Sequence, residues 1–207
     1  MDERHESPLD RVVADLAADG WSVCRGFVSH DVVRLLRARL REWWEEGELR
    51  HAGIGRGESF QVRDDIRGDY VRWLDFSVGG QFASSLDEHF EPLRLAVNRS
   101  LYFGLYEYEG HVTVYPPGAH YARHIDQFQD AAHRKLSLIL YLNDDDWSAG
   151  DGGELRLFLP GPAGEEIVDV RPEGGTLVAF LSHEIPHEVR ETRRERYSLT
   201  GWFRTRT

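Results

Sequence analysis

The sequence predicts a mainly β protein of the α+β class, with a jelly-roll core and N-terminal supporting helices. Short runs in which apolar and polar residues alternate fill the second half of the chain, separated by Pro, Gly and Asp clusters, as in antiparallel sandwiches and barrels. The first half instead carries apolar residues at helical spacing. We therefore expect one domain over residues 1–207, with helical support over about 1–105 and the jelly-roll core over about 106–207.

The N-terminal half contains three segments with helical periodicity and one short strand. The helices are expected over residues 8–19, 31–46 and 82–103, and the strand over residues 21–27. Ser29 or Asp31 is suited to cap the second helix, and Ser84 or Ser85 to start the third. The glycine-rich segment 47–69 between them is too polar for a helix and is predicted to form a loop with short strands.

The C-terminal half is predicted to form six strands. They are expected over residues 108–115, 135–143, 153–159, 166–170, 175–181 and 196–204. Alternation in the strand 135–143 separates four leucines from a more polar face that carries Ser137, Ile139 and Tyr141. In the last strand, alternation places Arg196, Ser198, Thr200 and Trp202 on one face and Tyr197, Leu199 and Phe203 on the other.

Composition limits the classes of partner. The chain of 207 residues has a formal charge of −11, with 36 acidic and 25 basic side chains, which argues against a broad nucleic-acid or anionic-membrane surface. Cys24 is the only cysteine, so an internal disulfide and a thiolate metal cluster are excluded. The charged segment 1–9 has no apolar core of signal-peptide length, and no run is long enough to span a membrane. We expect a cytoplasmic protein.

Histidine and carboxylate residues form a candidate metal site. His124 and Asp126 are two positions apart, so in a strand their side chains lie on the same face. His187, from a distant strand, completes a two-His-one-carboxylate set that leaves coordination positions open for a bidentate ligand and dioxygen. A structural zinc site would instead use four protein ligands. An H-x-D pair is common by chance, and a surface histidine beside a turn-forming aspartate is the alternative interpretation.

The last strand suggests an anion pocket. A guanidinium at Arg196 beside Tyr115 and Tyr141 is suited to bind the distal carboxylate of a dicarboxylic acid. For each tyrosine, packing in the core is an alternative interpretation of equal weight to binding a carboxylate. For Arg196 the alternative is a solvated salt bridge with Glu191 or Glu195.

These motifs together resemble the prolyl hydroxylase domain family of Fe(II)/2-oxoglutarate-dependent dioxygenases, which includes the hypoxia-inducible-factor prolyl hydroxylases and bacterial relatives. The resemblance runs from about residue 47 to residue 203. It is carried by DIRGDYVRWLD (65–75), YPPGAHYARHID (115–126), YLND (141–144) with Trp147, GGELRLF (152–158), HEV (187–189) and RYSLTGWF (196–203). Animal members have methionine where His111 stands, which implies a more polar co-substrate pocket in this chain.

The resemblance implies a double-stranded β-helix (jelly roll) and a set of site residues. Iron would be bound by His124, Asp126 and His187. The co-substrate 2-oxoglutarate would be held by Tyr115, Tyr141 and Arg196, with Thr200 nearby and Trp202 beside the iron-bound water. A substrate-covering loop would contain Arg67, Asp69 and Trp73. No further catalytic residue is implied. The cofactors would be Fe(II), 2-oxoglutarate and O2, with ascorbate as a candidate addition.

The expected activity is hydroxylation of a prolyl residue in a protein or peptide, with release of succinate and CO2. Hydroxylation of a free amino acid or small metabolite is the first alternative. A non-catalytic jelly-roll binding module would show a broken triad or a missing arginine, and the sequence shows neither. A zinc hydrolase would need a third histidine and a positioned carboxylate base, which the spacing does not supply convincingly.

Overall fold

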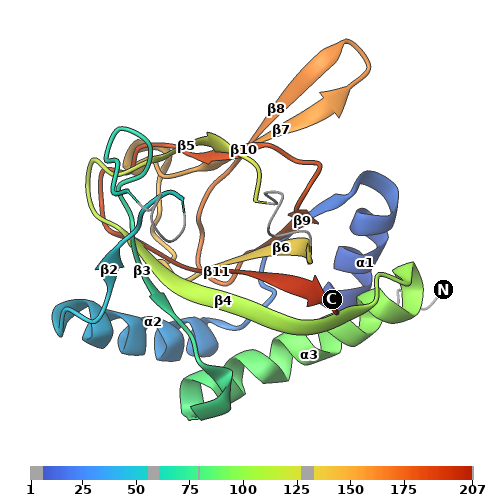
Figure 1. Ribbon diagram of the computed structural model, residues 1–207, viewed down its shortest axis with the longest axis horizontal. Coiled ribbons are helices and arrows are strands. Elements are labelled where there is room, and N and C mark those ends of the chain that lie inside the picture. Colours follow the sequence, from blue (N-terminus) through green and yellow to red (C-terminus); the bar gives the residue numbers. More distant parts are fainter. Residues whose placement is uncertain (1–6, 56–60, 79, 127–132, 207) are drawn as a thin grey trace.

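The computed structural model describes residues 7–55, 61–78, 80–126 and 133–206 and contains two antiparallel sheets with three helices (Figure 1). The helices are α1 (Pro8–Asp19), α2 (His30–Glu45) and α3 (Gln81–Leu101). The strands are β1 (Trp21–Cys24), β2 (Arg50–His51), β3 (Tyr70–Trp73), β4 (Leu105–Tyr115), β5 (Tyr121–His124), β6 (Arg134–Tyr141), β7 (Leu155–Gly161), β8 (Gly164–Val170), β9 (Leu177–Leu181), β10 (His187–Val189) and β11 (Arg196–Thr205). The larger sheet has the order β1-β9-β6-β11-β4-β3-β2 and the smaller one β5-β10-β7-β8, which confirms the predicted jelly roll.

The first two helices begin at serine caps, and the sequence analysis named the second of these serines as a candidate. The Ser7 side chain accepts a hydrogen bond from the backbone N–H of Asp10, and Gly20 ends α1 in the left-handed conformation with φ 76°. Ser29, rather than Asp31, caps α2 by accepting from the N–H of Val32. Local chemistry therefore fixes both starts.

The third helix begins earlier than predicted. It starts at Gln81 after Gly80, without a side-chain cap, and not near Ser84 or Ser85. Its first turn is held by tertiary packing, because the Phe82 ring lies 5.1 Å from the ring of Trp43 on α2. Such a contact between distant segments leaves no local sequence signal.

The helices pack on the outer face of the larger sheet (Figure 1). Their apolar sides join the alternate strand residues predicted to face away from the site, in a core that includes Leu36, Leu40, Phe90, Leu93, Val112, Val114, Leu136, Leu138, Leu140, Leu199 and Phe203. The opposite face of the sheet meets the smaller sheet and carries Tyr115, Ile139 and Tyr141. The predicted alternation of β6 and β11 is thus confirmed, and it directs Arg196, Thr200 and Trp202 between the two sheets.

Several predicted boundaries were wrong. The first strand ends at Cys24 rather than at residue 27, and α3 ends at Leu101, where Tyr102 adopts a left-handed conformation with φ 56°. By contrast, the segment 47–69, predicted to be a loop with short strands, does contain the short strand β2, and its residues 56–60 lie outside the described part of the chain. The segment 65–75, predicted to be a covering loop, includes β3, which pairs with β4 from Tyr70 to Trp73.

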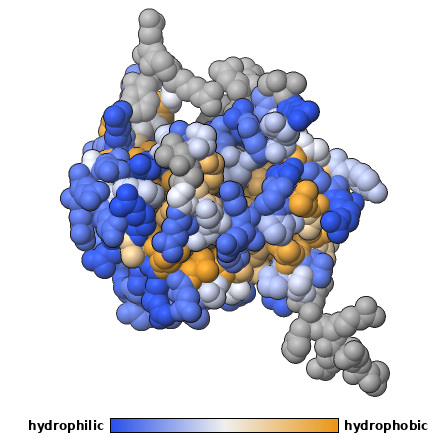
Figure 2. Space-filling view, turned by 90° about the horizontal axis from the view of Figure 1, so that it is seen from below, coloured by the Kyte–Doolittle hydropathy of each residue, from blue (hydrophilic) through white to orange (hydrophobic). Residues whose placement is uncertain are grey.

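The outer surface on the helical side is mostly hydrophilic, and apolar side chains show between the charged ones (Figure 2). This pattern is expected of helices whose apolar sides are buried against a sheet. No helix in the described ranges is long and apolar enough to cross a membrane.

Candidate metal centre

The three predicted metal ligands converge between the two sheets. His124 ends β5 and His187 begins β10, and the two residues face each other in the register of that strand pair. Asp126 follows two residues after His124, and one candidate ligand atom from each residue lies within 4.8 Å of the others. One Asp126 carboxylate oxygen is 3.6 Å from Nε2 of His124 and 3.7 Å from Nε2 of His187, too far for hydrogen bonds. A single cation between these atoms can bind all three.

Backbone carbonyls orient both imidazoles toward the centre. Nδ1 of His124 lies 2.9 Å from the carbonyl oxygen of Ala122, and Nδ1 of His187 lies 3.1 Å from that of Ile185. Since a carbonyl oxygen only accepts, each Nδ1 carries the proton and each Nε2 presents its lone pair to the cation. Such outer partners fix the orientation of metal-binding histidines.

Asp126 is held in the same way by a buried hydroxyl. Ser137 donates to Oδ2 of Asp126 at 2.7 Å, and the Ser137 hydroxyl also lies 2.9 Å from that of Ser182. Ser137 belongs to the more polar face of β6 identified from the sequence, so alternation alone could have found it.

The charge state of the group suits a divalent cation. Burial lowers the pKa of His187 to about 4, so its imidazole is neutral at neutral pH. Burial alone would raise the pKa of the Asp126 carboxyl, but the neighbouring His187 and His124 and the Ser137 hydrogen bond together hold that pKa well below its usual range. A neutral His187 imidazole and an ionised Asp126 carboxylate therefore face each other. Within the described ranges no fourth His, Cys or carboxylate ligand joins the group, which leaves positions open.

Arg196 is a buried cation without a carboxylate partner. It is 1% exposed, and its Nε donates to the carbonyl oxygen of Gly153 at 2.9 Å while Nη1 lies 3.4 Å from the Ser198 hydroxyl. No carboxylate in the described part of the chain pairs with it, and Glu195 instead accepts from the hydroxyl of Tyr197. The solvated salt bridge considered as an alternative is therefore excluded. An unpaired buried cation is costly, so this position favours a bound anion.

Two tyrosines flank Arg196 because β11 lies between β4 and β6. The Tyr115 and Tyr141 ring centroids lie 5.0 and 5.1 Å from the guanidinium carbon. Burial raises the pKa of Tyr141 to about 12, so its hydroxyl stays protonated, and it has no hydrogen-bond partner among the described residues. An unsatisfied buried donor beside an unpaired cation is a suitable anchor for a carboxylate.

One cavity of about 520 Å³ joins the metal ligands to Arg196. Tyr115 and Thr200 line its inner part, and the indole of Trp202 lines its wall with a buried Nε1 that has no partner among the described residues. The Arg134 guanidinium lies 3.5 Å above the Trp202 ring, a contact that gives no sequence signal. Tyr141 is not among the lining residues and packs behind Arg196.

His111, where the sequence suggested a more polar pocket, also lines this cavity. Its Nδ1 lies 2.9 Å from the Thr113 hydroxyl, and burial lowers its pKa to about 4, so its imidazole is neutral at neutral pH. The Trp73 ring meets it edge-on at 4.9 Å.

The three residues predicted for the substrate loop occupy different environments. Trp73 is 52% exposed at the cavity wall. Asp69 is fully buried, and its carboxylate accepts two hydrogen bonds from Arg67, at 2.7 and 2.6 Å. All three line the cavity, but only Trp73 has the exposure expected of a residue that covers a substrate.

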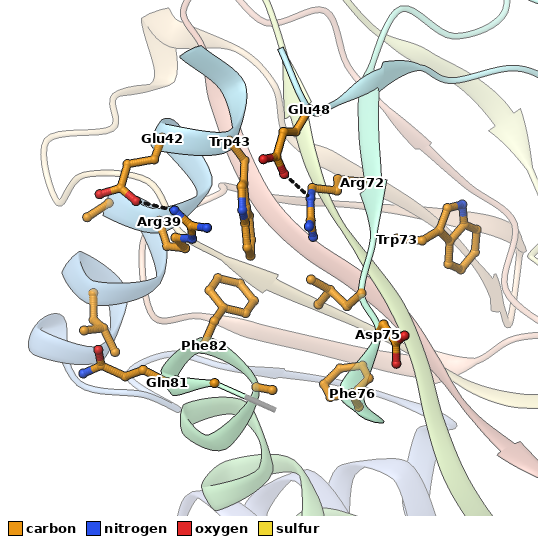
Figure 3. A pocket seen from close by; sticks show the side chains of 15 residues that line it. Arg39, Glu42, Trp43, Glu48, Arg72, Trp73, Asp75, Phe76, Gln81 and Phe82 are labelled. Carbon is orange, nitrogen blue, oxygen red and sulfur yellow. Dashed lines mark hydrogen bonds and ion pairs between the residues drawn. The ribbon is translucent and has the colours of Figure 1, made fainter. Parts of the chain in front are cut away.

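A second cavity, of about 640 Å³, lies between α2, β3 and the start of α3 (Figure 3). Its two arginines are already paired: Arg39 with Glu42 at 2.7 Å and Arg72 with Glu48 at 2.8 Å, and both stack on the Trp43 ring. Figure 3 shows the Trp73 ring on the side of β3 away from Trp43. The described residues place no group of metal ligands in this cavity, so we locate the chemistry in the smaller one.

A jelly roll with an open two-His-one-carboxylate group beside a buried cation defines the class of 2OG-Fe(II) oxygenases. The sequence profile of the 2OG-Fe(II) oxygenase superfamily matches residues 110–204, which include the metal ligands and Arg196. Together with the relatives described next, this match shows that the chain belongs to the prolyl hydroxylase family of 2OG-Fe(II) oxygenases.

Three relatives illustrate the similarity. A crystal structure of a Pseudomonas putida prolyl-4-hydroxylase is 45% identical, with a TM-score of 0.84, over 96% of this chain and 100% of that one. A Trichoplax adhaerens prolyl hydroxylase, solved in complex with a hypoxia inducible factor oxygen degradation domain peptide fragment, is 25% identical, with a TM-score of 0.85, over 96% and 90%. Human Egl nine homolog 1 is 29% identical over 94% of this chain and 46% of its own length. The chain spans about half the length of the first curated relatives that it matches.

Iron(II) and 2-oxoglutarate are the cofactors of this family, and the residues present fit both. The converging imidazoles and carboxylate suit a divalent metal, while the unpaired Arg196 guanidinium and the unpartnered Tyr141 hydroxyl suit the distal carboxylate of 2-oxoglutarate.

Proposed function

We propose that this protein is an Fe(II)- and 2-oxoglutarate-dependent dioxygenase that hydroxylates a prolyl residue of a protein or peptide. The observation that carries the proposal is the placement of an open metal group and an unpaired buried arginine in one cavity. Two relatives support the prolyl substrate: one is a prolyl-4-hydroxylase, and another is a prolyl hydroxylase solved in complex with a peptide fragment.

In this proposal the chain's residues bind and orient. His124, Asp126 and His187 would hold iron on one side of the cavity, and Arg196 would anchor the co-substrate, with Tyr115 lining the cavity beside it and Tyr141 packed against the guanidinium. With 2-oxoglutarate and dioxygen, bound iron supplies the oxidation that hydroxylates carbon and releases succinate and CO2. No side chain has to act as a general base.

The cavity wall would receive the target residue. Trp202 and the half-exposed Trp73 present flat apolar rings there, with ring centroids 6.2 Å apart. A pyrrolidine ring is compact and apolar and is suited to pack against such surfaces. The exposed position of Trp73 also allows contact with a longer peptide.

The proposal is tested with the full-length protein, Fe(II), 2-oxoglutarate and an array of synthetic peptides that each contain one proline. We expect some peptides to gain the mass of one oxygen atom in step with succinate release, and the same peptides with alanine for proline to stay unmodified. Free L-proline is assayed in parallel. Hydroxylation of free proline alone, with every peptide unmodified, would replace this proposal with the amino-acid alternative.

A further inference from the structure

Four side chains form a column that ends on a metal ligand: Asp69, Arg67, Tyr121 and the ligand His124. The Tyr121 ring lies parallel to the imidazole of His124, with ring centroids 3.7 Å apart and an interplanar angle of 15°. The guanidinium carbon of Arg67 lies 4.2 Å from the Tyr121 ring centroid, within the range of a cation–π contact. Arg67 in turn forms its two-point hydrogen bond with the buried carboxylate of Asp69.

The backbone fixes this column to β5. The N–H of Gly68 donates to the carbonyl of His120 at 3.0 Å, and the N–H of Ala122 donates to that of Ile66 at 2.7 Å. Arg67 and Tyr121 also form a bridge between their backbones. The segment that carries Arg67 is thus hydrogen-bonded to β5, the strand that ends with His124. It is attached to that strand and is not a separate loop over the cavity.

The column supplies a restraint that the backbone does not. The hydrogen bond from Nδ1 of His124 to Ala122 sets the direction of Nε2, but it leaves the imidazole free to tilt about that bond. A parallel ring at 3.7 Å restricts the tilt, and the Arg67–Asp69 pair holds that ring from behind. No comparable ion pair supports His187 among the residues that the structure describes, and its ring contacts Phe180 at 4.7 Å with a tilt of 60°.

The hydrogen bonding of Arg67 argues against a movement of its side chain toward a substrate. Its Nε and one terminal nitrogen both donate hydrogen bonds to the Asp69 carboxylate, and the Asp69 side chain is 1% exposed. Moving either group to meet a peptide would leave a buried charge unpaired, which is strongly unfavourable. Trp73 is the exposed residue of the three.

We propose that Asp69, Arg67 and Tyr121 are positioning residues that hold the His124 imidazole in its ligating orientation before the metal binds. This inference rests on the proposed function, because it takes the triad to be the iron site. It assigns Arg67 and Asp69 to the support of a metal ligand and leaves substrate contact to Trp73.

The test is a titration of the full-length apoprotein with Co(II), whose visible spectrum reports ligand geometry and which requires neither co-substrate nor turnover. Tyr121→Leu, which removes the ring, is expected to weaken Co(II) binding about 10- to 100-fold, the range for outer partners of metal ligands. Tyr121→Phe keeps the ring and is expected to restore affinity and spectrum. Arg67→Met, which removes the charge, is expected to weaken binding in the same direction.

Arg63→Met is the matched control. Arg63 makes the same two-point contact with Asp65, at 2.7 and 2.6 Å, with the same spacing in the sequence but on the exposed surface. It is expected to leave Co(II) binding unchanged. Combining Arg67→Met with Tyr121→Leu should add little to Tyr121→Leu alone, because both changes break one column.

Two results separate this inference from the proposed function. Wild-type Co(II) affinity and spectrum in both Tyr121→Leu and Arg67→Met would overturn the positioning role while leaving the metal site intact. Failure of the wild-type protein itself to bind Co(II) at the triad would contradict the proposed function as well. Thermal melting of each apoprotein shows whether a variant is folded, and Asp69→Asn, which nearly preserves shape, replaces any variant that is not.

Discussion

Replacing His187 with alanine is expected to reduce 2-oxoglutarate turnover by more than about 100-fold, beyond the effect of losing an outer partner of a ligand. The substitution removes one of two nitrogens from a group whose ligand atoms lie within 4.8 Å of one another. His187 is 3% exposed and bonded through Nδ1 to Ile185, so solvent cannot readily replace its nitrogen in the same place. The measurement is succinate formation under saturating Fe(II).

His183→Ala is the matched control for that substitution. His183 lies four residues earlier, in the connection that leads to β10, and its partly exposed side chain pairs with Glu184 at 2.9 Å. Its turnover should equal that of the wild type. If His187→Ala retained wild-type turnover, the triad would not be the metal site.

Replacing Arg196 with alanine is expected to raise the KM for 2-oxoglutarate at least about 30-fold, equivalent to about 2 kcal/mol for a lost buried charge pair. The physical reason is that this guanidinium has no carboxylate partner of its own among the described residues and lies within about 5 Å of two tyrosine rings. Fe(II) affinity should change little, because the triad is separate. Initial rates at a series of 2-oxoglutarate concentrations give the KM.

Two further variants make the Arg196 result specific. Arg196→Lys keeps the charge but loses the planar fork of donors, so an intermediate KM is expected. Arg194→Ala removes a surface arginine that pairs with Asp146 at 3.1 Å and should leave the KM unchanged. A wild-type KM for Arg196→Ala would refute the anchoring role.

The parts of the fold that could be predicted are those that local patterns encode. Alternation identified both faces of β6 and β11, and therefore the inward direction of Arg196, Thr200 and Trp202. The spacing of His124 and Asp126 indicated a shared face of one strand; the structure places both with His187, but β5 ends at His124 and Asp126 lies beyond it. Ser29 marked the start of α2 because capping is a local interaction.

The remaining features depend on contacts between distant segments. The strand β10 has only three residues, too few to show periodicity, and β3 is defined by its pairing with β4. Nothing local distinguishes the buried pair Arg67–Asp69 from the exposed pair Arg63–Asp65, which has the same spacing. The stack of Tyr121 on His124 could not be predicted either, because residues three apart in a regular strand lie on opposite faces. The pairing of β5 with β10 is irregular between these two positions.

The most direct measurement is the visible spectrum of the wild-type protein and of Asp126→Ala, reconstituted anaerobically with Fe(II) and then titrated with 2-oxoglutarate. In the wild type we expect a weak metal-to-ligand charge-transfer band that saturates with 2-oxoglutarate, and in Asp126→Ala a lost or altered band. Folded, iron-loaded wild-type protein that shows no band on addition of 2-oxoglutarate would contradict the central claim that iron and the co-substrate share this cavity.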